Sequence, residues 1–460
     1  MSASRDSVWL VLPEPLSTRI LFDCGIVDGL RDRVGRSMRL VSLMSPEQSA
    51  EWTGRVDGLD VSSRDEFLPV QVDTRQKVFR RVDRWLDRKV GFYPLAIRLN
   101  LRHGFHLERM QRGHKNYGLD IARVGPLPCH RAVDRRMLHW HYGTRRWVPA
   151  AVLEPMRAEC RAVVFSNVQT ERVVPFLLAA RRLRLATVGY VASWDHTVGK
   201  GVISPYLDRY IVQNDIMRAD LVRYHGIAEE RIVVTGWPQT DIYTRQRPRA
   251  DFDSALRGFG LDPGRELVIV MGNTPTNTPY ERHFVERIVR WWDERAERER
   301  FSLLFRPHPR DSEWRTRFAA ALDRDDIVVQ TPSYTDLELL ATLLQHASCV
   351  VANAGTILLD SVVNDRPVVC VLYDEGAPAG ESWAAKNAMG EHYRQLMESG
   401  AFYRAADFGE VAAAIDRALA HPAELAEERR RVAREVVGEV DGRAGARVVD
   451  AIAAVVGGPA

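Results

Sequence analysis

Short apolar runs, rich in β-branched residues, alternate along the chain with longer stretches in which apolar residues recur at helical spacing. In the second half, for example, "ELVIVMGN" is followed by the helical pattern "YERHFVERIVRWWDERAE" and then by "FSLLF". Strands that are apolar throughout are typical of parallel sheets whose two faces are both covered by helices. The alternation therefore predicts an α/β protein with Rossmann-like, doubly wound sheets.

Interruptions of this pattern divide the chain into predicted domains. A chain of 460 residues is long enough for two to three domains. A polar stretch at residues 243–254, which contains Pro248, predicts a linker between two Rossmann-like domains. We predict the domains at residues 1–242 and 255–425, followed by a helical tail over 426–460.

Residues 75–147 break the alternation inside the first domain and are predicted to form a basic helical insertion. This segment carries 18 Lys and Arg against 5 Asp and Glu, a local balance of +13 in a chain of net charge +3. Several aromatic side chains lie among these charges. Such a surface suits an anionic membrane or a polyanionic acceptor, and a solvated arginine-rich helical face is the alternative. We do not expect nucleic acid as the partner.

Composition favours a globular protein of the cytoplasm. The chain is 45% hydrophobic and 27% charged, and its five cysteines are scattered without a C-x-x-C pair. We see neither a signal peptide nor an apolar run long enough to span a membrane. The "HWH" at 139–141 has no third ligand at a recognisable spacing, so no metal and no cofactor are expected. Walker A and G-x-S-x-G motifs are absent from the sequence.

Two loops in the second domain carry polar residues where predicted strands end. Gly272, Asn273 and Thr274 follow "LVIVM", and Arg306 and His308 follow "FSLL" within "FRPHP". Ligands of open α/β sheets bind beyond the carboxyl ends of the strands, and arginine can bind an anion bidentately. An ordinary turn with a helix cap explains the first loop equally well. Pairing of Arg306 with a nearby aspartate is the alternative for the second.

The third such loop is "NAGTILLDS" at residues 353–361. Gly355 leaves room for a ligand, and a helix that begins at Thr356 would favour a phosphate at its N-terminus. Asp360 lies one helical turn further on the same face and could accept hydrogen bonds from a ribose. Helix capping alone is the competing explanation.

These motifs resemble those of nucleotide-sugar glycosyltransferases with the GT-B fold. The "RPHP" and "AGTILLD" loops are similar to those of the CDP-glycerol glycerophosphotransferase and capsule-polysaccharide transferase branch. The late "DGRAGARVVDAIA" resembles a closing helix of the same proteins, and "SWDHTVGKG" at 193–201 is similar to a pattern in bacterial members of the superfamily. The resemblance implies a nucleotide-diphosphate donor bound by the second domain and an anionic or lipid-linked acceptor bound by the first. It also implies an enzyme at the inner face of the membrane.

The resemblance assigns roles to residues of both domains. Arg306 and His308 would neutralise the donor's diphosphate, Gly355 and Thr356 would hold a phosphate, and Asp360 would bind the ribose. In the first domain, Asp195 or His196 is the candidate general base, with Glu14 as a further candidate. Arg19 and Lys200 are candidate contacts of a phosphate or an anionic acceptor. The alternative for the 193–201 loop is a structural network around a buried Trp194.

The resemblance predicts a metal-independent transferase that moves a sugar or polyol-phosphate unit to a cell-envelope or polysaccharide acceptor. One alternative keeps the fold and makes the protein an isomerase of the UDP-N-acetylglucosamine 2-epimerase type. The other alternative is a non-catalytic protein that binds a nucleotide or a polyanion.

The charge of residues 75–147 predicts binding to anionic lipid. Each exposed basic residue near an anionic surface contributes on the order of 1 kcal/mol. We expect the protein to float with anionic vesicles at low salt and to be released at high salt. Neutral vesicles are the control, and absence of flotation with anionic vesicles at low salt would rule out membrane docking.

Overall fold

The described residues form two compact units. The computed structural model describes residues 5–55, 59–67, 148–199, 203–296, 298–322, 324–379 and 381–457. The predicted insertion at 75–147, the "HWH" sequence and Lys200 lie outside these ranges. Unit 1 holds the described residues up to Asp241 and those from Asp441 onward, and unit 2 holds Ile242–Val440. The chain passes from unit 1 to unit 2 within helix α13 (Pro238–Thr244).

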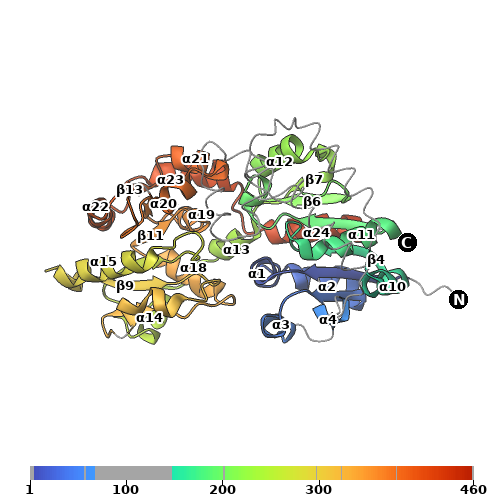
Figure 1. Ribbon diagram of the computed structural model, residues 1–460, viewed down its shortest axis with the longest axis horizontal. Coiled ribbons are helices and arrows are strands. Elements are labelled where there is room, and N and C mark those ends of the chain that lie inside the picture. The colour runs from blue at the N-terminus through green and yellow to red at the C-terminus, as the bar shows by residue number, and fades with distance from the viewer. Residues whose placement is uncertain are drawn as a thin grey trace. The chain divides into compact units, whose positions relative to one another are not determined.

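Unit 1 is built on a seven-stranded parallel sheet with the order β3-β2-β1-β4-β5-β6-β7 (Figure 1). Its strands are β1 (Ser7–Leu12), β2 (Met38–Ser42), β3 (Asp60–Ser62), β4 (Cys160–Phe165), β5 (Ala186–Tyr190), β6 (Arg209–Val212) and β7 (Ile232–Val234). Leu10 in β1 aligns with Leu40 of β2 on one side and with Val164 of β4 on the other. These central strands are buried almost throughout, as their continuous apolar sequences predict.

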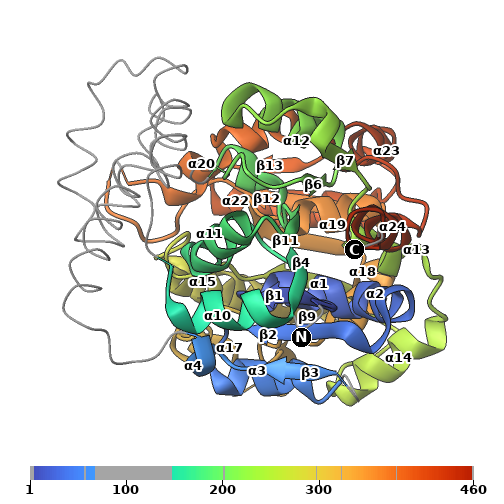
Figure 2. The same ribbon diagram turned by 90° about the vertical axis from the view of Figure 1, so that its right-hand side faces the viewer.

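Helices cover both faces of this sheet. They are α1 (Pro15–Asp23), α2 (Ile26–Val34), α3 (Pro46–Thr53), α4 (Arg64–Phe67), α10 (Ala150–Glu159), α11 (Val174–Leu183), α12 (Asp215–Asp220) and α24 (Ala444–Val456). Figure 2 shows α10 and α11 on one side of β1 and β4, and α2 and α24 on the other. On the first of these faces, Trp9, Phe67 and Phe176 form an edge-to-face aromatic row with ring centroids 5.5 Å apart.

Unit 2 repeats this architecture with a six-stranded parallel sheet of order β10-β9-β8-β11-β12-β13. Its strands are β8 (Glu266–Met271), β9 (Phe301–Arg306), β10 (Ile327–Val329), β11 (Cys349–Asn353), β12 (Val368–Val371) and β13 (Tyr403–Ala405). Its helices are α14 (Arg249–Gly258), α15 (Glu281–Glu294), α16 (Trp314–Arg317), α17 (Ala319–Leu322), α18 (Leu337–His346), α19 (Ile357–Val363), α20 (Trp383–Ala388), α21 (Arg394–Glu398), α22 (Phe408–Ala420) and α23 (Ala426–Val432). One face of the sheet packs against α15 and α22 through a continuous apolar core.

The predicted pair of Rossmann-like, doubly wound sheets is confirmed. The sequence pattern did not reveal β3 and β13, since each is a three-residue edge strand without an apolar run. The segment predicted as a linker, 243–254, holds the end of α13 and the first half of α14. In the predicted tail, α23 belongs to unit 2, whereas α24 belongs to unit 1. No helix in the described ranges is long and apolar enough to cross a bilayer.

Helix α24 packs tightly onto unit 1 at its first turn. The backbone N–H groups of Ala444 and Gly445 donate to the two carboxylate oxygens of Asp241, at 3.1 and 2.7 Å. A Cβ atom on Gly445 would lie 2.7 Å from the carbonyl oxygen of Cys24. Because this neighbour is backbone, it cannot move aside as a flexible side chain could. Glycine at 445 is therefore required by the docking of α24.

We expect Gly445→Ala to destabilise unit 1 by about 1–3 kcal/mol, the usual cost of overpacking. The measurement is thermal unfolding monitored by circular dichroism. Gly258→Ala is the matched control, because a Cβ at this exposed position in α14 meets nothing within 4 Å. The control should melt at the wild-type temperature or slightly above it, since alanine is the better helix former. Equal melting of all three proteins would refute the packing argument.

Candidate functional site

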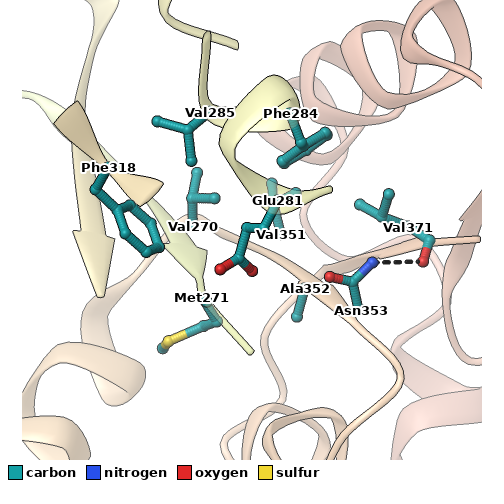
Figure 3. A pocket seen from close by; sticks show the side chains of 11 residues that line it. Val270, Met271, Glu281, Phe284, Val285, Phe318, Val351, Ala352, Asn353 and Val371 are labelled. Carbon is teal, nitrogen blue, oxygen red and sulfur yellow. Dashed lines mark hydrogen bonds between the residues drawn. The ribbon is translucent and has the colours of Figure 1, made fainter. Parts of the chain in front are cut away.

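The strand order of unit 2 creates a switch point between β8 and β11. From β8 the chain adds β9 and β10 on one side, and it then returns to add β11, β12 and β13 on the other. Ligands of doubly wound sheets bind at such a point, beyond the carboxyl ends of the strands. A pocket lies there, lined by apolar side chains of β8 and β11 and by Phe284 and Phe318 (Figure 3). Its polar side chains are Glu281 and Asn353.

The loop after β8 fits closely against the loop after β9. The N–H of Gly272 donates to the carbonyl oxygen of Arg306 at 2.9 Å. A Cβ on Gly272 would lie 2.8 Å from Phe318 and 3.1 Å from the Cα of Pro307, so glycine is needed for this approach. Asn273 and Thr274 follow in a compact turn, in which the Asn273 side chain accepts the N–H of Thr274 at 2.8 Å. The two predicted loops therefore share one edge of the site.

An ion cluster that the sequence did not reveal holds these two loops. Arg317 lies 2.7 Å from Glu281 and 2.5 Å from Asp311, and all three side chains are nearly inaccessible to solvent. Arg317 also donates to the carbonyl oxygen of Asn273 at 2.8 Å, and Glu281 accepts the N–H of Asn273 at the same distance. Burial raises the pKa of Glu281 to about 7, against the lowering effect of the Arg317 charge. Asp311 lies six residues before Arg317, but Glu281 is remote from both in the sequence, so no local pattern indicates the whole cluster.

Arg306 is part of a second buried network rather than an open anion site. Its guanidinium lies 2.7 Å from Asp336 and donates to the side chain of Gln330. The alternative that pairs this arginine with an aspartate is therefore the one observed. His308 is partly exposed, and its Nδ1 accepts the N–H of Arg310 at 3.0 Å. This bond fixes the ring within the proline-flanked loop.

The turn between β11 and α19 is partly exposed at Asn353, Gly355 and Thr356. Asn353 donates from Nδ2 to the carbonyl oxygen of Val371 at 3.1 Å (Figure 3), and Asn387 donates to that of Ala354 at 2.9 Å. A Cβ on Gly355 would meet only ordinary contacts. Among the described residues, none accepts a hydrogen bond from the backbone N–H of Gly355 or Thr356. This turn thus presents free N–H donors beside the switch-point pocket.

Asp360 lies one turn further along α19 and is 3% exposed. Its Oδ1 accepts the hydroxyl of Tyr243 at 2.9 Å. A ribose would have to reach this carboxylate through a nearly closed surface, and the predicted ribose contact stays a prediction.

In unit 1, the corresponding switch point lies between β1 and β4. Glu14 follows β1 and caps α1 by accepting the N–H of Ser17 at 3.2 Å. The same oxygen accepts Nδ2 of Asn167, which follows β4, at 3.1 Å. Glu14 therefore lies directly across the switch point of the first sheet. Arg19, on the next turn of α1, donates to Gln239 over 3.4 Å.

The loop that carries Asp195 and His196 follows β5 and forms the single-turn helix η5 (Trp194–Thr197). Asp195 is partly exposed and accepts the hydroxyl of Ser193 at 2.5 Å. His196 is 9% exposed, and its Nε2 lies 3.9 Å from Asp195. Trp194 is buried, as the structural alternative for this loop requires.

His225 holds this loop in place through both nitrogen atoms of its ring. Its Nδ1 accepts the N–H of Ile203 at 2.8 Å, and its Nε2 lies 2.7 Å from the carbonyl oxygen of Thr197. Since the backbone N–H can only donate, the hydrogen of the ring is on Nε2 and the imidazole is neutral. Burial lowers the pKa of His225 to about 4. The loop of Asp195 is thus held by a histidine that resists protonation.

No group of three or more His, Cys, Asp or Glu side chains in the described ranges is arranged to hold a metal ion.

Comparisons with known proteins agree with this architecture. The family model described as CDP-Glycerol:Poly(glycerophosphate) glycerophosphotransferase matches residues 202–454, more than half of the chain. No curated protein sequence matches the chain.

Solved structures match over nearly the whole length of the chain. UDP-GlcNAc 2-epimerase from Neisseria meningitidis, bound to UDP-GlcNAc, matches with a TM-score of 0.54 at 9% identity, over 97% of this chain and 99% of that chain. MnaA from S. aureus with UDP matches with a TM-score of 0.50 at 12% identity, over 97% and 96%. UDP-GlcNAc 2-epimerase from Methanocaldococcus jannaschii, in complex with UDP-GlcNAc and UDP, matches with a TM-score of 0.50 at 12% identity, over 97% and 99%. At these identities the likeness shows the fold, and the predicted GT-B fold is confirmed.

The buried neutral His225 predicts that acid destabilises unit 1. Between its ordinary pKa of 6.5 and its folded value of about 4, the unfolded chain binds a proton that the folded chain excludes. The contribution of neutral His225 to the free energy of unfolding is therefore complete above pH 6.5. This contribution falls as the pH drops toward 4, by at most about 3 kcal/mol.

His225→Gln removes this ionisation, so its melting temperature should fall less than that of the wild type between pH 7 and pH 5. The exposed His421→Gln is the control and should retain the wild-type pH dependence. Identical pH profiles for His225→Gln and the wild type would contradict the assignment.

Proposed function

Since the chain belongs to the CDP-glycerol:poly(glycerophosphate) glycerophosphotransferase family, we propose that it transfers a polyol-phosphate unit from a nucleotide-activated donor to a cell-envelope acceptor. The acceptor class is a polysaccharide or a glycolipid. The chain is a glycerophosphotransferase-like enzyme, and the proposal concerns its donor and acceptor. The proposal that unit 2 binds the donor rests on one observation: the loops after β8, β9 and β11 lie at the switch point of its sheet.

We propose that the donor's diphosphate lies beside the β11–α19 turn. The N–H groups of Gly355 and Thr356 would donate to phosphate oxygens, and His308 would add a further donor from the β9 loop. Arg306 is already paired with Asp336, which compensates most of its charge. Its proposed role is therefore to hold the β9 loop in place and to add only a weak attraction for the diphosphate. These donors would stabilise the leaving nucleotide without a metal ion.

In the proposed reaction, a hydroxyl oxygen of the acceptor attacks the donor phosphorus that is distal to the nucleoside. The new P–O bond forms as the bond to the bridging diphosphate oxygen breaks, and the nucleoside monophosphate leaves. A general base takes the proton of the attacking hydroxyl. Asp195, His196 and Glu14 are the candidates. Asp195 and Glu14 are both partly exposed, and Asp195 accepts the hydroxyl of Ser193 within its loop.

Transfer and isomerisation are distinguished by the substrates they need. The isomerase alternative rests on a fold likeness alone, and it requires no acceptor. If the protein is a transferase, incubation with UDP-GlcNAc alone should leave this nucleotide sugar unchanged. Appearance of the C2 epimer would refute the transferase proposal in favour of the isomerase.

The donor proposal predicts a nucleotide preference and a role for His308. Thermal-shift titration should show stabilisation by CDP or CMP above that by UDP, because a ligand that binds only the native state raises its melting temperature. His308→Ala should weaken CDP binding at least tenfold, and the loss of one hydrogen bond to a charged group accounts for this magnitude.

His421→Ala is the matched control, because it removes an exposed histidine of the same unit. It should bind CDP as the wild type does. Unchanged CDP affinity in His308→Ala would remove this residue from the site. Unchanged transfer activity of His308→Ala would favour the non-catalytic alternative for this loop.

A further inference from the structure

Arg19 is a buried cation without a counter-ion. The residue is 9% exposed. Its Nε is enclosed without a hydrogen-bond acceptor, and Nη2 reaches only the amide oxygen of Gln239, over 3.4 Å. Within the described part of the chain, no carboxylate forms an ion pair with it. A guanidinium removed from water in this way lowers stability unless an anion compensates it.

The other buried arginines of the described residues all have such compensation. Buried arginines besides Arg19 are Arg306, Arg317 and Arg429. Each lies within 2.7 Å of a carboxylate: Asp336 for Arg306, Glu281 and Asp311 for Arg317, and Asp365 for Arg429. The fold thus pairs its structural arginines internally, and Arg19 is the exception.

The position of Arg19 leaves it accessible to a ligand. It lies on α1, which begins at the carboxyl end of β1 and therefore at the switch point of the first sheet. Nη1 makes no hydrogen bond to any described residue, yet it is not among the nitrogen atoms enclosed away from solvent. The guanidinium therefore keeps one open edge, with Gln239 against the other.

We propose that Arg19 binds a phosphate group of a substrate in unit 1, with Gln239 orienting the guanidinium. A planar guanidinium with free N–H groups matches two phosphate oxygens at once. The proposal rests on the proposed function for the source of that phosphate. With the donor's diphosphate assigned to unit 2, the phosphate of a polyol-phosphate acceptor is the source that fits unit 1, and Arg19 would then select acceptors that carry one.

The test compares the wild type, Arg19→Gln and Arg182→Gln by thermal shift. Arg182 lies in unit 1 on α11 and is exposed, so its variant makes the same charge change away from the site. The probes are glycerol 3-phosphate, glycerol at the same concentration, and CDP. Glycerol 3-phosphate is titrated with CDP held at saturation, so that the donor site is occupied.

We expect glycerol 3-phosphate, but not glycerol, to stabilise the wild type and Arg182→Gln. Arg19→Gln should lose this response, equivalent to at least tenfold weaker binding, and retain its response to CDP. Without ligand, Arg19→Gln should melt at the wild-type temperature or above it, because an uncompensated charge has been removed.

Three results would overturn the inference: no response of the wild type to glycerol 3-phosphate, a normal response of Arg19→Gln to glycerol 3-phosphate, or failure of Arg19→Gln to fold. Loss of the CDP response in Arg19→Gln would assign the bound phosphate to the donor instead. If the wild type binds CDP but the Arg19→Gln variant behaves normally, this inference fails while the proposed function stands. Absence of CDP binding by the wild type counts against the donor proposal alone.

Discussion

Parallel pairing of every strand is the constraint from which both candidate sites follow. A parallel pair cannot be joined by a tight turn, so each connection crosses a face of the sheet and all strands end at the same edge. Where the order reverses, between β1 and β4 and between β8 and β11, neighbouring loops leave in opposite directions. The crevice between such loops is open to a ligand. Within each unit, the polar residues that follow its two switch-point strands are therefore brought together by topology, although the sequence separates them widely.

Buried charge then makes the loops beside the crevice of unit 2 rigid. In unit 2, Arg317 joins the β8 and β9 loops through two carboxylates and a backbone carbonyl. Breaking such a buried cluster by removing one partner costs about 3–5 kcal/mol, because the remaining charges lose their compensation. The loops are thus held in one arrangement before any donor binds. Binding energy need not be used to order them, which favours preorganised recognition of a phosphate.

Most of the fold could be predicted from the sequence, because buried parallel strands such as β8 and β11 are continuous apolar runs. Edge strands β3 and β13 could not, since three residues with polar neighbours give no pattern. At the site, the loops were predicted correctly in position, but their internal partners were not. Arg306 shows why: a strand-end arginine looks the same in sequence whether it faces a ligand or Asp336. Nothing near Glu281 or His225 in the sequence indicates their roles, because Arg317 is remote from Glu281 and the partners of His225 lie 22 and 28 residues away.

Helix α24 has a consequence for how the polypeptide is made. It belongs to unit 1 but is synthesised after the whole of unit 2. While the nascent chain ends before residue 441, the carboxylate of Asp241 and the face of α2 around Gly29 lack the groups that later cover them. Unit 2 is contiguous in the described chain and can close as soon as it leaves the ribosome, whereas unit 1 must wait for its last helix. This flank of unit 1 can therefore be covered only after the whole of unit 2 has been translated.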